Sequence, residues 1–155
     1  MPAQTRPRCA QRLMHGLLAG LLLAGGAQAQ FAMVPAPVPP TLQPSQAESD
    51  KDYRGDAARH LYAVYPLRIY KGRMPPLLYG VAIIETEIDA TGAVIDVRIR
   101  RQPAAPEVGP WIQQMIRKAA PFPPPAKMDK ATYVDIWLVH KGGNFQLDTL
   151  TEGQN

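Results

Sequence analysis

Histidine, serine and acidic side chains are the groups in this sequence that could carry out catalysis or hold a metal. His60 and His140 lie in separate predicted elements, and neither has a second ligand at the short spacing typical of zinc sites. Ser45 and Ser49 lie in a proline-rich stretch, so the predicted folded region has no serine for a Ser-His-Asp arrangement. The chain also has no glycine-rich phosphate-binding pattern. We therefore expect a protein that is not an enzyme and that uses no cofactor, metal or small-molecule substrate.

Residues 80–101 contain a dense group of opposite charges. Two β-rich runs are separated by residues 89–92, Asp-Ala-Thr-Gly, which is typical of a type I turn followed by a bulge. The second run shifts its apolar phase, which a β-bulge near residues 95–96 would explain. In that register two glutamates face two arginines across the hairpin, so we expect ion pairs on a solvated face and not a catalytic carboxylate pair. The four residues are Glu85, Glu87, Arg98 and Arg100.

One helix is predicted before this hairpin in the sequence and one after it. The first has Asp56 as candidate N-cap and ends before Pro66. Its apolar face consists of Ala57, Leu61, Val64 and Tyr65. Residues 110–120 form the second helix, with an apolar stripe facing the sheet. The PFPPP segment that follows cannot continue a helix, so we expect a stiff joint inside the domain with Phe122 in the core.

The last long predicted strand, residues 132–140, alternates two sets of side chains. We expect Val134, Ile136 and Leu138 to point into the core. The opposite set is expected to face outward and contact a partner, because exposed aromatic residues often mark an interaction surface. These candidate partner-binding residues are Tyr133, Asp135, Trp137 and Val139. The alternative is that the first helix or the C-terminal tail covers this face.

The order of these elements is helix, strand, strand, helix, strand, with FQLD at residues 145–148 as an optional fourth strand. This order predicts an α+β fold. We expect a small antiparallel three-stranded sheet, extended by a short fourth strand if FQLD pairs, with two helices packed on one face.

Residues 1–29 have the three parts of a secretory signal peptide: a basic start, an apolar stretch and the small-x-small pattern of Ala27 and Ala29. We expect cleavage after Ala29; the alternative is an uncleaved anchor. Residues 30–51 form a proline-rich tether, residues 52–150 the domain and residues 151–155 a polar tail. Cys9 lies in the leader, so the cleaved chain would have no cysteine.

The charge of the chain is concentrated in this leader. The full sequence has 17 basic and 13 acidic residues, and three of the arginines precede residue 13. The remainder is therefore close to neutral, and we expect no nucleic-acid partner.

The folded region resembles the C-terminal domain of the TonB family, a TonB/TolA-like periplasmic domain. The match consists of Tyr65-Pro66, Gly80, IIETEIDATGAVIDVRIRR at residues 83–101, AAPFPPP at 119–125 and the strand at 132–140. The chain departs from the family pattern at Thr86, where the family has an aromatic residue. It also lacks the family's N-terminal anchor motif.

This resemblance implies a periplasmic protein-binding domain that pairs an extended segment of an outer-membrane receptor with the edge of its sheet, and that couples inner-membrane energy to transport. The alternative is a secreted accessory or structural envelope protein with the same fold and no role in energy transduction. We expect a protein partner, with a homodimer as an alternative. Membrane contact is expected only if the leader is retained, which would make the protein inner-membrane anchored and facing the periplasm.

Overall fold

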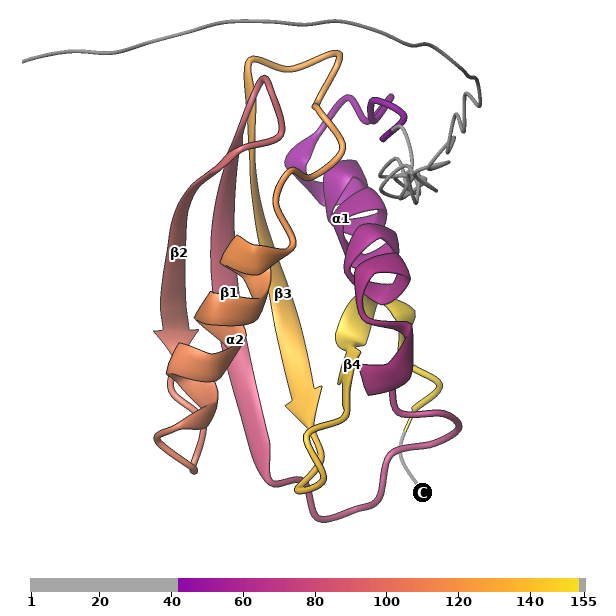
Figure 1. The fold of residues 1–155 in the computed structure, drawn as a ribbon, viewed down its shortest axis with the longest axis vertical. Helices are drawn as coiled ribbons and strands as arrows, with labels where there is room; N and C mark the ends of the chain where they lie inside the picture. Colours follow the sequence, from indigo (N-terminus) through magenta and orange to yellow (C-terminus); the bar gives the residue numbers. More distant parts are fainter. Residues whose placement is uncertain (1–41, 154–155) are drawn as a thin grey trace, which may run out of the picture. The chain divides into compact units, whose positions relative to one another are not determined.

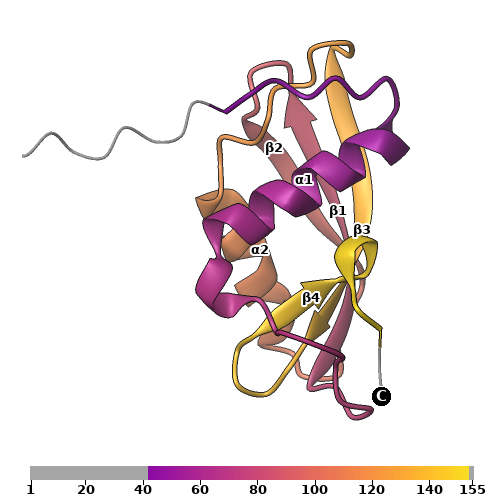
Figure 2. The same ribbon diagram turned by 90° about the vertical axis from the view of Figure 1, so that its right-hand side faces the viewer.

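The computed structural model describes residues 42–153, in which two helices cover one face of a four-stranded sheet (Figure 1; Figure 2). The elements are α1 (Asp50–Val64), η1 (Pro66–Arg68), β1 (Gly80–Asp89), β2 (Val94–Arg101), α2 (Val108–Lys118), β3 (Lys130–Val139), β4 (Phe145–Leu147) and η2 (Asp148–Leu150). All neighbouring strands are antiparallel, in the order β2-β1-β3-β4. The predicted α+β fold and its short fourth strand are confirmed.

The predicted leader, with Ala27 and Ala29, and the tether up to residue 41 lie outside the described residues. Among residues 42–153, no helix has the length and apolar character needed to cross a bilayer.

Helix α1 begins six residues before the predicted N-cap, Asp56. Its N-cap is Ser49, whose hydroxyl accepts a hydrogen bond from the Asp52 backbone N–H at 3.2 Å. Two acidic residues in the first turn, Asp50 and Asp52, suit the positive end of the helix dipole. Asp56 instead accepts hydrogen bonds from the side chains of Ser45 and Arg59. The predicted domain boundary at residue 52 therefore lies inside a helix.

The PFPPP segment is a joint inside the domain, as predicted. Phe122 is completely buried, and its N–H donates to the carbonyl of Gly92 in the hairpin turn at 2.8 Å. Pro124 accepts from the N–H of Ser45 at 2.9 Å, so residues expected in the tether pack against this joint. Gly92 has φ +88°, and a Cβ there would lie 2.1 Å from the Phe122 carbonyl oxygen. Glycine is therefore required for the turn to approach the joint.

The β1–β2 hairpin has the predicted faces and irregularity. Buried and half-buried residues alternate along β1, with Ala82, Ile84, Thr86 and Ile88 buried against the helices. The β1–β2 register shifts between Glu87 and Ile88, which leaves Ile95 as the bulged residue. The charged residues of β1 and β2 are thereby placed on the solvated face.

Strand β4 is short and is held by aromatic packing. The Phe145 ring lies 4.6 Å from that of Trp137 on β3 and 6.4 Å from that of Trp111 on α2, measured between centroids. The chain leaves the sheet after Leu147, whose N–H donates to the Tyr62 hydroxyl at 3.1 Å. Residues 151–153, predicted as polar tail, are also held: Gly153 accepts from the Met74 N–H at 2.9 Å.

Candidate strand-pairing edge

Strand β3 is paired along one side for its whole length and along the other side only at its end. It pairs with β1 from Lys130, opposite Asp89, to Val139, opposite Gly80. Strand β4 pairs only with residues 137–139. Within residues 42–153, no strand pairs with the other side of β3 from Lys130 to Ile136 (Figure 1). We call this segment the open edge.

The backbone groups of the open edge follow the alternation of an antiparallel strand. The N–H of Thr132 donates to Asp50 Oδ1 at 2.7 Å, so this N–H points away from β1. By alternation, the N–H and C=O groups of Val134 and Ile136 point the same way. The Ile136 N–H donates to Asp135 Oδ1 at 2.8 Å. Two amides of the edge are thus bound by carboxylates, and the Val134 amide lies between them.

Val134 is the most accessible apolar residue of this edge, since 41% of its surface is exposed. Its side chain lies on the solvated face of the sheet, opposite the helices. The open edge therefore offers a partner two kinds of contact: backbone hydrogen bonds at Thr132 and Val134, and the apolar side chain of Val134.

A half-buried ion pair lies at the end of the open edge nearest β4. Arg54 of α1 contacts Asp135 Oδ1 at 2.8 Å and Asp148 Oδ2 at 3.2 Å. These contacts place η2 beside β3 at Asp135, so the freest part of the edge runs from Lys130 to Val134. Burial raises the pKa of Asp135, and the hydrogen bond and charge of Arg54 oppose that shift.

The predicted orientation of β3 is wrong. Its candidate partner-binding residues face the helices and are almost fully buried: Tyr133 is 4% exposed, Asp135 1%, Trp137 1% and Val139 2%. Val134, Ile136 and Leu138, predicted to be inward, lie on the opposite face. The alternative for this strand, coverage by the first helix, is the arrangement that the structure has. The four buried residues are unavailable to a partner.

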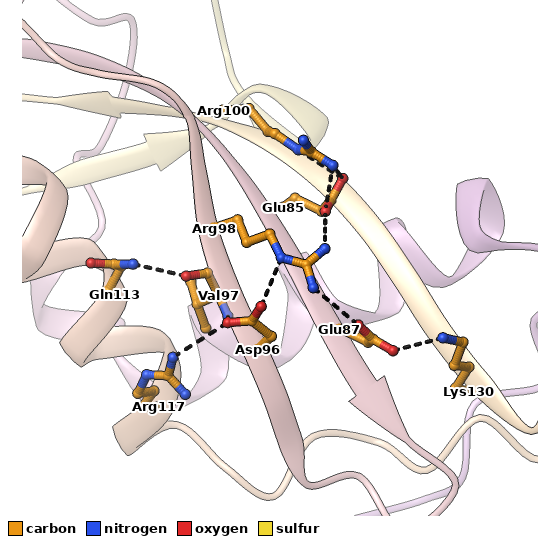
Figure 3. Close-up of polar contacts among 9 residues, drawn as sticks. All are labelled: Glu85, Glu87, Asp96, Val97, Arg98, Arg100, Gln113, Arg117 and Lys130. Carbon is orange, nitrogen blue, oxygen red and sulfur yellow. Dashed lines mark hydrogen bonds and ion pairs between the residues drawn. The ribbon is translucent and has the colours of Figure 1, made fainter.

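The opposite edge of the sheet, β2, is closed at its centre. The Val97 N–H donates to Asp96 Oδ1 at 2.7 Å, and the Val97 carbonyl accepts from Gln113 Nε2 of α2 at 2.8 Å (Figure 3). Both backbone groups that a partner strand would use at Val97 are therefore occupied. This difference favours β3 over β2 as the pairing edge.

The predicted cross-strand ion pairs are confirmed and belong to a larger network on the solvated face (Figure 3). Glu85 contacts Arg98 at 3.1 Å and Arg100 at 2.6 Å, and the Arg100 contact is the main reason that the pKa of Glu85 is lowered. Glu87 contacts Arg98 at 3.8 Å and Lys130 at 2.7 Å. The network thus spans β2, β1 and the first residue of the open edge.

The two histidines considered for metal binding have separate partners. His60 is buried in α1, where its Nε2 lies 2.8 Å from the Ala119 carbonyl oxygen and its ring packs 4.7 Å from the Phe122 ring. His140 follows β3, and its Nδ1 accepts from the Gly142 N–H at 3.1 Å. The structure does not bring the two side chains into one site.

The residues that form the open edge differ from those that the sequence pattern indicates. That pattern assigns Asp50 to the tether and Val134 to the core. One signal is present: Lys130 and Thr132 are polar residues at the start of a strand that, apart from Asp135, is apolar or aromatic, and this is typical of a protected edge. Comparisons of the chain with protein-family models, with curated proteins and with solved structures found no match.

Proposed function

We propose that this chain is a periplasmic protein-binding domain, of the kind found at the C-terminus of TonB-like proteins, that captures an extended partner segment as an added strand on the open edge of β3. The observation that carries the proposal is the pairing pattern of β3, which has β1 along its full length and β4 along only three residues. A half-paired strand is a template for strand addition.

The chemistry of the edge supports this type of binding. A partner strand would exchange backbone hydrogen bonds with Thr132 and Val134, each contributing about 0.5–1.5 kcal/mol net. A side chain of the partner would also cover Val134 on the solvated face. Because the backbone supplies most contacts, the partner must present an extended segment, and apolar or β-branched residues would fit opposite Val134.

Asp50 regulates access to the edge in this proposal. Its carboxylate holds the Thr132 amide that the incoming strand must bind. The partner therefore replaces a charge-assisted hydrogen bond, which disfavours weak or accidental pairing and protects the edge from aggregation.

Site-directed photocrosslinking in cells tests where the partner binds. We expect a photoreactive residue at Val134 to crosslink one envelope protein. The same residue at Ile95, which is 51% exposed on β2, is the matched control and should not crosslink that protein. Equal crosslinking at both positions would contradict the proposal.

A role in energy transduction depends on the N-terminal leader. The Ala27-Gln28-Ala29 pattern favours the second candidate, a secreted accessory protein with the same binding edge and no connection to an inner-membrane motor. The mass of the purified native protein distinguishes the two. A chain that begins at Gln30 supports the accessory protein, and a chain that retains residues 13–29 in the membrane fraction supports the transducer.

A further inference from the structure

The connection between α1 and β1 combines exposed leucines with basic residues. No acidic residue occurs between Asp56 and Glu85 in the sequence, and four basic residues do. Leu67 and Leu77, both in this connection, are 92% and 89% exposed. Exposure of this degree on two leucines leaves apolar surface in water with no partner in the described structure.

The connection gathers around the β3–β4 turn at one end of the domain, the lower end in Figures 1 and 2. The Leu67 carbonyl accepts from Asn144 Nδ2 at 3.4 Å, and Arg68 donates to the Gly143 carbonyl at 3.4 Å. At the other end of the connection, the Tyr79 N–H donates to the Val139 carbonyl at 3.0 Å. We call the exposed leucines and basic residues of this connection and of the β3–β4 turn the basic tip; they are Leu67, Arg68, Lys71, Arg73, Leu77 and Lys141.

The middle of the connection is fixed to β4. The Tyr70 N–H donates to the Phe145 carbonyl at 2.9 Å. Gln146 Nε2 in turn donates to the carbonyls of Tyr70 at 2.9 Å and Gly72 at 2.7 Å. Met74 is completely buried. Leu67 and Leu77 are therefore exposed on a segment that is held to the domain by hydrogen bonds and by the burial of Met74.

The basic residues of the tip are free of ion pairs with any carboxylate in residues 42–153. Two acidic residues are linked to the connection: Glu107 accepts from the Tyr79 hydroxyl, and Glu152 precedes Gly153, whose carbonyl accepts from the Met74 N–H. Four cations against two acids leave the tip positive. On the sheet face, by contrast, arginines and glutamates neutralise each other.

We propose that the basic tip docks on the surface of an anionic lipid bilayer, with Leu67 and Leu77 inserted at the headgroup boundary and the cations on the lipid phosphates. Apolar side chains flanked by Lys and Arg are the composition that binds this interface. A polyanion such as nucleic acid would use the charges and leave the leucines in water. The docking requires neither residues 13–29 nor strand pairing at β3.

This orientation would hold the open edge away from the membrane. Strand β3 runs from Lys130 to Val139 toward the tip, and ten residues span about 33 Å at about 3.3 Å per residue. The freest part of the open edge, Lys130 to Val134, lies in the half of β3 away from the tip, so a partner strand and a bilayer could bind at the same time.

Hydrogen exchange of the full chain with vesicles tests the proposal locally, which matters because residues 13–29 are apolar enough to bind vesicles themselves. The vesicles contain either phosphatidylcholine alone or equal parts of phosphatidylcholine and phosphatidylglycerol. We expect the anionic vesicles to slow exchange in residues 66–79 and the neutral vesicles to do so much less. Protection elsewhere in the domain, with none at residues 66–79, would overturn the proposal.

Paired variants separate the two contributions. Leu67→Ser with Leu77→Ser should abolish the protection, while Ile95→Ser, an exposed apolar residue on β2, should leave it unchanged. Lys71→Glu with Arg73→Glu should lower affinity for the anionic vesicles by about tenfold or more, and Lys118→Glu, at the far end of α2, should not. If the leucine variant keeps full protection and only the charge variant loses it, the tip binds the lipid headgroups by charge alone, which would contradict the proposed insertion of Leu67 and Leu77. Unchanged circular dichroism checks that each variant is folded.

Discussion

The Asp50 carboxylate in the first turn of α1 accepts a hydrogen bond from the Thr132 backbone N–H of β3 at 2.7 Å. This contact joins the start of the helix to the open edge of the sheet. It shields one of the amides that an added strand would use. In the proposed function, the same contact both stabilises the domain and limits strand pairing.

Replacing Asp50 with alanine should increase strand pairing. The Thr132 amide loses its acceptor, so the edge becomes available to a partner or to a second copy of the chain. We expect Asp50→Ala to shift the protein toward dimers in sedimentation velocity. Asp52→Ala is the control, because it also removes an acidic residue from the first turn of α1, worth about 0.3–1 kcal/mol, but Asp52 is hydrogen-bonded to Ser49 and not to β3. Equal association of both variants would show that Asp50 does not protect the edge.

Removing one partner of the half-buried Arg54–Asp135 ion pair should destabilise the domain more than replacing both partners by apolar residues. Asp135→Ala leaves the half-buried Arg54 guanidinium with Asp148 as its remaining carboxylate, and we expect the free energy of unfolding to fall by about 1–3 kcal/mol. The double variant Arg54→Met with Asp135→Leu replaces both charges by apolar groups and should lose less than the single variant. Urea unfolding measures both. A double variant that is less stable than Asp135→Ala would show that the loss in the single variant does not come mainly from the Arg54 charge left without its partner.

The pKa of His60 predicts a loss of stability in mild acid. Burial lowers this pKa from its ordinary value of 6.5, against the opposing effect of the Ala119 carbonyl. The unfolded chain therefore binds a proton more readily than the folded chain, so the stability that neutral His60 supplies is complete above about pH 6.5 and is lost as the pH falls toward the folded pKa.

Replacement of His60 with glutamine tests this sign. The amide can still donate to the Ala119 carbonyl but does not titrate. We expect the stability difference between the wild type and His60→Gln to change as the pH falls from about 7 to about 5, with the wild type losing more. Parallel pH curves for the two proteins would rule out His60 as the titrating group.

Two glycines with positive φ should respond differently to alanine. Gly92→Ala places a Cβ 2.1 Å from the Phe122 carbonyl oxygen, so the hairpin turn and the proline joint must separate. We expect a loss of about 3 kcal/mol or more. Gly72 has φ +80°, but a Cβ added there would meet no atom within 4 Å, so Gly72→Ala should cost only the backbone strain, about 1–2 kcal/mol. Similar midpoints in thermal unfolding would contradict the close contact.

The hairpin and the proline joint could be predicted from the sequence because their signals are local. In the hairpin, charged residues alternate with apolar ones, so the pattern shows which face is solvated. The shift in the apolar alternation of the second strand locates the bulge at Ile95. In the joint, four prolines exclude a helix and leave Phe122 as the one large apolar side chain.

The open edge could not be predicted because its determinants are distant in the sequence. In TYVDIWLV both faces are largely apolar, so alternation alone does not say which face is buried. The burial of Asp135 depends on Arg54, which lies 81 residues earlier in the chain. The N-cap of α1, Ser49, lies in a polar, proline-rich sequence that resembles a tether.

The most direct test of the proposed function compares two substitutions of Val134. Val134→Pro removes the edge N–H, which does not contribute to the β1 ladder, and proline is tolerated on an edge strand. Val134→Thr keeps the N–H and the β-branched shape. With the protein crosslinked through position 134 as the ligand, titration calorimetry should show at least roughly tenfold weaker binding for Val134→Pro and nearly unchanged binding for Val134→Thr. Equal affinity of the proline variant and the wild type, with both folded by circular dichroism, would contradict strand pairing at β3.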